Sequence, residues 1–190
     1  MADAYSYLQL TDLFNKDLSR IDEFHAIPDD LISLKPDPTT WSASEVIQHV
    51  IKFNELYISQ MDVAVDSNNM VKAQKELFKP RFVFRHAIRF FEPPYKVKVK
   101  TFAPMYPNNS GNKDPKQPID ELAEMNRNLI RRIETFRDEQ LDLDRIKGKN
   151  PIIKWIPMSL SEFILLLEAH QRRHFWQIEQ TLLKLSGQKY

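Results

Sequence analysis

The chain of 190 residues contains no cysteine. Disulfides, thiolate metal sites, iron–sulfur clusters and a cysteine nucleophile are therefore excluded, and any metal ion must be bound by histidine or by carboxylates. The chain has 3 glycines, which disfavours an all-β protein with many tight turns and favours long helices. Its length suits one domain spanning residues 1–190, and 42% hydrophobic residues are enough for a core.

An excess of either charge is also missing. Lys and Arg total 27 and Asp and Glu total 26, which leaves a net charge of +1 and disfavours nucleic acid and anionic membranes as partners. No run of 18 uncharged apolar residues occurs, and the first residues lack the basic and apolar segments of a signal peptide. We therefore expect a cytoplasmic protein without a membrane partner.

Apolar residues recur at helical spacing in four long segments, over residues 4–24, 42–66, 119–141 and 159–185. The second helix is predicted to begin at Ser42 or Ser44 and the fourth at Ser159 or Ser161, because serine caps helix N-termini. The spacing of Ser42 and Glu45 is that of a capping box. Four long helices predict an all-α fold, and long connections between them allow a four-helix bundle with a crossover.

The connections between these helices are rich in proline. Residues 92–118 contain six of the 12 prolines and predict an irregular excursion between helices two and three. Within it, residues 95–102 alternate like a short strand or an extended loop, and one or two short helices are expected before it, over residues 70–91. Residues 27–40 and 147–157 are predicted to be plain connections.

Two histidines interrupt the apolar stripe of the last helix. His170 and His174 are four residues apart, so their imidazoles lie on one face and can share a metal ion, although histidines at this spacing also occur as packing residues. His49 is the best third ligand because Val46 and Phe53 place it beside the apolar stripe of its helix. Three imidazoles would leave coordination positions open on zinc, nickel, iron or manganese.

The HExxH motif of metalloproteases is not present, because Gln171 follows His170. Glu45 is the candidate catalytic carboxylate, and Glu168 is a second, either of which could orient a ligand or move a proton. A capping or solvated role is the alternative for both. Arg172 and Arg173 could bind a carboxylate-bearing substrate at the mouth of the site, or form the polar face of the helix.

The runs Trp41–His49 (WSASEVIQH) and His170–Ile178 (HQRRHFWQI) resemble the DinB/YfiT-like superfamily, and the resemblance extends over essentially the whole chain. The resemblance implies an up-down-down-up four-helix bundle, often a homodimer. It also implies a divalent metal ion, typically nickel or zinc, held by His49, His170 and His174.

Members of this family include bacillithiol S-transferases and a mycothiol-dependent maleylpyruvate isomerase. The resemblance therefore implies an enzyme that acts on a small molecule, either a thiol S-transferase or a hydrolase, because both could use the same three ligands. Without cysteine in the chain, the sulfur of a transferase would come from a low-molecular-weight thiol cosubstrate. The alternative is a non-catalytic bundle that binds metal or acts in a stress response.

Overall fold

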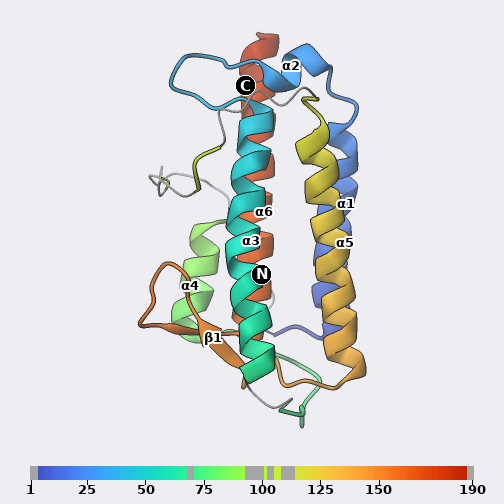
Figure 1. Cartoon of the computed structure of the whole chain (residues 1–190), viewed down its shortest axis with the longest axis vertical. Coiled ribbons are helices and arrows are strands. Elements are labelled where there is room, and N and C mark those ends of the chain that lie inside the picture. Colours follow the sequence, from blue (N-terminus) through green and yellow to red (C-terminus); the bar gives the residue numbers. More distant parts are fainter. Residues whose placement is uncertain (1–3, 68–70, 93–100, 102–104, 108–113, 188–190) are drawn as a thin grey trace.

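A computed structural model describes residues 4–67, 71–92, 101, 105–107 and 114–187. Four long helices run along the long axis of the molecule (Figure 1): α1 (Tyr7–Phe24), α3 (Ala43–Ser67), α5 (Gln117–Asp138) and α6 (Leu160–Ser186). These are the four segments with helical periodicity, so the predicted four-helix bundle is confirmed.

The bundle has the up-down-down-up topology. In Figure 1, α1 and α6 run upward, whereas α3 and α5 both run downward. Helix α5 packs against both α1 and α3, and α6 packs against α3 and α1. Because α3 and α5 are parallel, the chain must return along the bundle between the end of α3 and the start of α5. The short helix α4 (Phe82–Phe90) precedes the excursion and packs against α6.

Side-chain hydrogen bonds cap the starts of α3 and α6, and residues with positive φ lie at the ends of α5 and α6. Ser159 caps α6 in a capping box with Glu162, and Gly187 ends this helix in the left-handed conformation at φ 72°. Ser42 accepts a hydrogen bond from the Glu45 amide and donates its own amide to the Glu45 carboxylate, as predicted. Helix α5 ends before the predicted residue 141 because Gln140 adopts a φ of 53°.

Among the shorter elements, α4 lies where a short helix was predicted, within residues 70–91, and the others differ from the predictions. Helix α2 (Asp29–Ser33) forms within the connection at 27–40, because proline is well tolerated at a helix start, where Pro28 lies. Strand β1 (Lys147–Lys149) pairs antiparallel with β2 (Pro157–Ser159), so residues 147–159 form a hairpin. Gly148 packs so closely on α3 that a Cβ would lie 2.9 Å from the Ala64 Cβ. The predicted strand at 95–102 lies outside the described residues except for residue 101.

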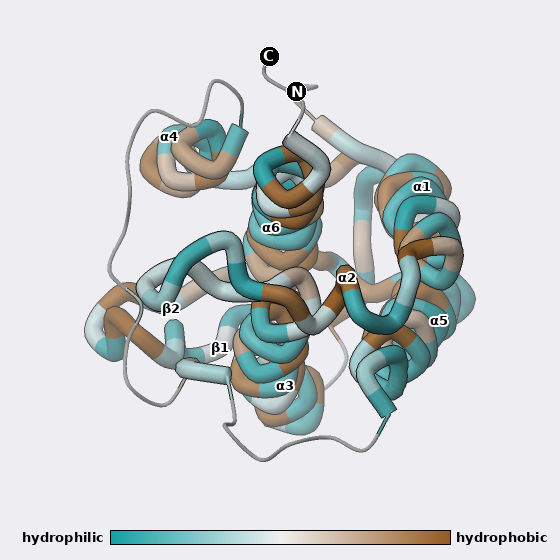
Figure 2. Tube along the Cα trace, turned by 90° about the horizontal axis from the view of Figure 1, so that it is seen from above, coloured by the Kyte–Doolittle hydropathy of each residue, from teal (hydrophilic) through white to brown (hydrophobic). Residues whose placement is uncertain are grey.

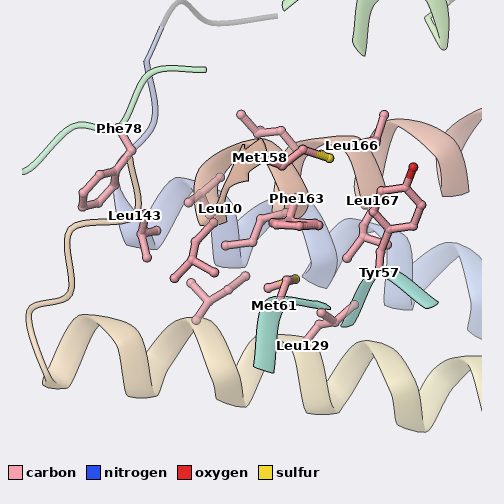
Figure 3. Packing of buried hydrophobic residues seen from close by; sticks show 14 of the residues in the cluster. Leu10, Tyr57, Met61, Phe78, Leu129, Leu143, Met158, Phe163, Leu166 and Leu167 are labelled. Carbon is pink, nitrogen blue, oxygen red and sulfur yellow. The ribbon is translucent and has the colours of Figure 1, made fainter. Parts of the chain in front are cut away.

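The core lies between the long helices. Figure 3 shows one part of it, in which Phe163 of α6 lies among Leu10, Met61 and Leu129 of the other long helices. A second cluster near the other end includes Phe175. Seen along the bundle in Figure 2, α4 and the β1–β2 hairpin lie beside the α3–α6 pair, on the side away from α1 and α5. The α3–α6 pair is therefore enclosed on both sides.

A buried polar layer crosses this core, with one side chain from each long helix. Gln171 Nε2 donates to Asp17 Oδ2 at 2.9 Å and to Asn126 Oδ1 at 3.1 Å. Gln171 Oε1 accepts from Asn54 at 3.2 Å and from Asn126 at 2.9 Å. All four residues are buried, so these hydrogen bonds compensate for lost hydration.

We expect Asp17→Asn to stabilise the protein at neutral pH. Burial, and then the negative charge of Glu168, raise the pKa of Asp17 well above its ordinary value. The folded state therefore keeps a proton that the unfolded chain releases above a pH of about 4, and stability falls as pH rises from there toward the raised pKa. At pH 7, the free energy of unfolding of the Asp17→Asn protein should exceed that of the unchanged protein by on the order of 1 kcal/mol.

Urea denaturation of both proteins between pH 4 and pH 8 tests this expectation. The stability difference should grow with pH, whereas Asp22→Asn, at an exposed position of the same helix, should produce no such trend. A difference that stays constant over this range would show that Asp17 is ionised in the folded protein.

Candidate metal centre

The three predicted ligands meet between two neighbouring helices. His49 lies in α3, and His170 and His174 lie on successive turns of α6, which packs directly against α3. One ring nitrogen from each residue lies within 4.8 Å of the other two. His170 Nε2 and His174 Nε2 are 3.1 Å apart. The structure thus brings all three imidazoles to one point, where they are buried.

Hydrogen bonds orient two of the rings. His49 Nδ1 lies 2.9 Å from the Met105 carbonyl oxygen, and His174 Nδ1 lies 2.9 Å from Gln177 Oε1. Because these oxygens only accept hydrogen bonds, each Nδ1 carries the proton and each Nε2 keeps its lone pair. This is the usual arrangement of a metal-binding histidine, whose other nitrogen donates to an oxygen.

His170 is held differently. Its ring stacks on Phe53, with centroids 3.6 Å apart and planes 11° apart. Its Nδ1 is buried and has no hydrogen-bond partner among the described residues. Among the described residues, its Nε2 has one polar neighbour, His174 Nε2, and that atom has a lone pair. A cation shared by the two Nε2 atoms would satisfy both lone pairs, so this geometry fits a bound metal ion.

All three imidazoles are neutral at neutral pH. Burial is the largest cause in each case: it lowers the pKa of His49, lowers that of His170 well below its ordinary value, and lowers that of His174 to about 3. Lys52 contributes to the shift of His49, and Arg173 contributes to the shifts of both others. A metal ion binds neutral imidazole, so no proton has to be removed before it binds here at pH 7.

Aromatic rings surround the histidines. Trp41 lies 5.2 Å from His49, Phe91 lies 5.6 Å from His170, and Tyr106 packs on Trp41 at 6.1 Å between centroids. Phe91 directly follows α4 and Tyr106 lies in the excursion, and no periodicity identifies either of them as a site residue. Their role could be found only from the folded structure.

The candidate carboxylates have other partners. Glu45 caps α3 through its Oε2 atom, and its Oε1 atom lies 2.7 Å from Lys35 Nζ. Glu168 is buried and forms two hydrogen bonds with Arg172, at 2.7 and 3.0 Å. In the described part of the chain, no hydrogen bond joins either carboxylate to the three histidines. Helix capping explains the position of the Glu45 side chain, and its catalytic role stays a prediction.

The donor set is therefore three neutral nitrogens without a bound carboxylate. Imidazole is a ligand for zinc, nickel, iron and copper, and zinc sites with three protein ligands keep a further position for water or substrate. The residues present fit a divalent ion of this group.

Among the described helices, none has the length and apolar character needed to cross a membrane.

Comparisons with known proteins agree with this architecture. The structure of YfiT from Bacillus subtilis, described as "a probable metal-dependent hydrolase with an unusual four-helix bundle topology", superposes with a TM-score of 0.59 at 14% identity. The match covers 96% of this chain and 89% of that one. No curated protein sequence matches. The family model of the DinB superfamily matches residues 15–178, so this chain belongs to the DinB superfamily.

Proposed function

We propose that this protein is a metal-dependent hydrolase that acts on a small molecule, with one divalent ion, zinc or nickel, bound by His49, His170 and His174. The observation that carries the proposal is the convergence of three buried, neutral imidazole nitrogens within 4.8 Å. The description of YfiT as a probable metal-dependent hydrolase supports it, since the two chains share a fold.

The chain's own residues prepare the site for this chemistry. The Met105 carbonyl and the Gln177 side chain hold the rings of His49 and His174 with Nε2 available, while Phe53 fixes His170 by stacking. A divalent ion supplies Lewis acidity, which polarises a carbonyl group and lowers the pKa of a water or thiol. The surrounding aromatic rings limit access of bulk water, and electrostatic interactions are stronger in such surroundings.

We expect ester hydrolysis to require both the metal and the histidines. Zinc- or nickel-loaded protein should hydrolyse simple aryl esters, and the rate should fall by about 100-fold or more in His170→Ala, because two ligands do not hold an ion in a defined geometry. The same preparations should be assayed for transfer of a thiol to an electrophilic aryl halide, which tests the thiol S-transferase alternative.

The outcomes distinguish the candidate functions. Metal-dependent thiol transfer without hydrolysis would replace the hydrolase by the transferase. Stable metal binding with neither activity would favour the non-catalytic metal-binding bundle. Hydrolysis by the His170→Ala protein at the rate of the unchanged protein would place the reaction elsewhere.

A further inference from the structure

The short helix α4 has apolar side chains on two opposite sides. Phe84 and Ile88 are buried and belong to the core. On the other side of the helix, Phe82 and Val83 are 67% and 65% exposed, and Ala87, one turn further along, is exposed as well. A helix that only covers a core presents polar residues to solvent, so the outer side of α4 is suited to contact with an apolar partner.

The loop of the β1–β2 hairpin has the same character. Trp155 is 81% exposed, which makes it the most exposed large apolar side chain of the described residues, and Ile153 is 42% exposed. Both lie in the loop that joins the two strands. Single apolar side chains on a surface are common, but these two lie close together in the chain and in an element beside α4.

A buried carboxylate holds α4 and the hairpin together. Glu162 is fully buried in the first turn of α6, and its Oε1 atom accepts hydrogen bonds from the amide and Nε of Arg81 at 2.9 and 2.8 Å. The same guanidinium donates to the Pro157 carbonyl at the start of β2. Because Arg81 directly precedes α4, the start of this helix is fixed against the hairpin, and Figures 1 and 2 both show the two elements side by side. The α4–hairpin surface is defined here by Phe82, Val83, Ile153 and Trp155.

Positive charge is concentrated in the same two segments. Residues 79–91 and 147–158 contain seven of the 27 Lys and Arg residues of the chain and none of its 26 Asp and Glu residues. The rest of the chain is therefore net negative. The net charge of +1, which disfavours an anionic partner for the chain as a whole, averages over this uneven distribution.

Three of these cations are available to an external partner. Arg81 is paired with Glu162 and is not one of them. Arg89 in the last turn of α4, and Lys149 and Lys154 in the hairpin, are exposed. In the part of the chain that the structure describes, none of these three side chains forms an ion pair. Apolar side chains and cations therefore reach solvent from the same two elements.

This combination disfavours two classes of partner. A second copy of the chain, docked by two-fold symmetry, would place the surface against itself, so that the cations Arg89 and Lys154 of both copies would meet like charges. A nucleic acid would match the charge, but its bases stack on aromatic rings, and Val83 and Ile153 have none. A lipid surface with negative headgroups above hydrocarbon matches both the charge and the apolar side chains.

We propose that the α4–hairpin surface binds a membrane surface that contains anionic lipid. The rings of Phe82 and Trp155 lie among the headgroups, where aromatic side chains are favoured, and Arg89 and Lys154 lie beside the lipid phosphates. The protein binds peripherally, and salt weakens the attraction because it screens exposed charges. The three histidines lie outside this surface, so the inference does not depend on the metal centre.

Flotation of the full chain with lipid vesicles tests the proposal. Vesicles of equal parts phosphatidylcholine and phosphatidylglycerol should bind about tenfold more tightly or more than vesicles of phosphatidylcholine alone, and added salt should reduce the difference. Trp155→Ala should weaken binding to the anionic vesicles by about tenfold, and Phe82→Ala severalfold. Arg89→Gln and Lys154→Gln should each weaken it by about fivefold.

Two positions on α1, on the opposite side of the bundle, provide matched controls. Leu8 is 65% exposed, and Lys16 is an exposed cation. Leu8→Ala and Lys16→Gln should leave vesicle binding unchanged. Losses as large as those at Trp155 and Lys154 would overturn the assignment to this surface. Thermal denaturation identifies variants that fail to fold, and the exposed positions of Phe82 and Trp155 make their variants the least exposed to this risk.

Other results would replace the lipid by another partner. Equal binding to both kinds of vesicle, or to neither, would overturn the proposal. Binding of a single-stranded oligonucleotide without binding of vesicles would assign the surface to nucleic acid instead. Self-association in light scattering that is lost in Trp155→Ala would make the surface an interface between copies of the chain, and would also overturn it.

Discussion

His49→Ala should lower the affinity for zinc or nickel by about 100-fold or more, because even residues that only support metal ligands change affinity by about 10- to 100-fold. The unchanged protein, purified without an affinity tag, should hold about one ion per chain. The ligand lost is the one supplied by α3, so the pair on α6 would remain with two nitrogens. Elemental analysis and competition with a chromophoric chelator measure both quantities.

His86→Ala is the matched control for this experiment. His86 lies on α4, is exposed, and has its Nδ1 3.0 Å from the Phe82 carbonyl. Its replacement should leave the metal content unchanged. Full occupancy in a folded variant that lacks all three site histidines would refute the metal centre, and the proposed hydrolase with it.

Phe163→Ala should destabilise the fold by about 3–5 kcal/mol, the cost typical of removing a buried ring and leaving a cavity. Phe163 is fully buried among core residues of the other long helices (Figure 3), and its ring lies 6.0 Å from that of Tyr57. Close packing of Gly148 nearby leaves the hairpin little freedom to collapse into the space. Urea denaturation monitored by circular dichroism measures the loss.

The same substitution at a solvent-exposed phenylalanine provides the comparison. Phe82 is 67% exposed at the start of α4, so Phe82→Ala should change stability by less than about 0.5 kcal/mol. Comparable losses at both positions would mean that burial does not determine the contribution of these rings.

The long helices were predictable because each buries one stripe of residues at a period of 3.6, and because serine marks the starts of α3 and α6. Helix α3 begins at Ala43, directly after Ser42, and α6 begins at Leu160, directly after Ser159. The hairpin was not predictable, because its strands are three residues long and depend on close packing of Gly148 against α3. A period of two cannot be recognised in three residues.

The three histidine ligands of the candidate site were predictable from the sequence, whereas the side chains around them were not. His170 and His174 share a helix face through their spacing alone, and His49 borders the stripe that faces them. By contrast, Phe91, Tyr106 and Lys52 join the site through contacts between segments far apart in the chain. Such contacts depend on the path of the excursion, for which local sequence patterns give no signal.

The buried amide of Gln171 has a consequence for the histidine that precedes it. Residues 163–167 of α6 are all buried and apolar. Hydrophobic packing alone would therefore tolerate a helix shifted along its axis or rotated about it. A shift of one residue turns α6 by about 100° and moves it by about 1.5 Å. That shift would break the hydrogen bonds of Gln171 to the other three long helices and, in the same movement, turn His170 and His174 away from His49. The polar layer thus fixes the register of α6. Only a bundle in which this register is correct also brings the three histidine nitrogens together.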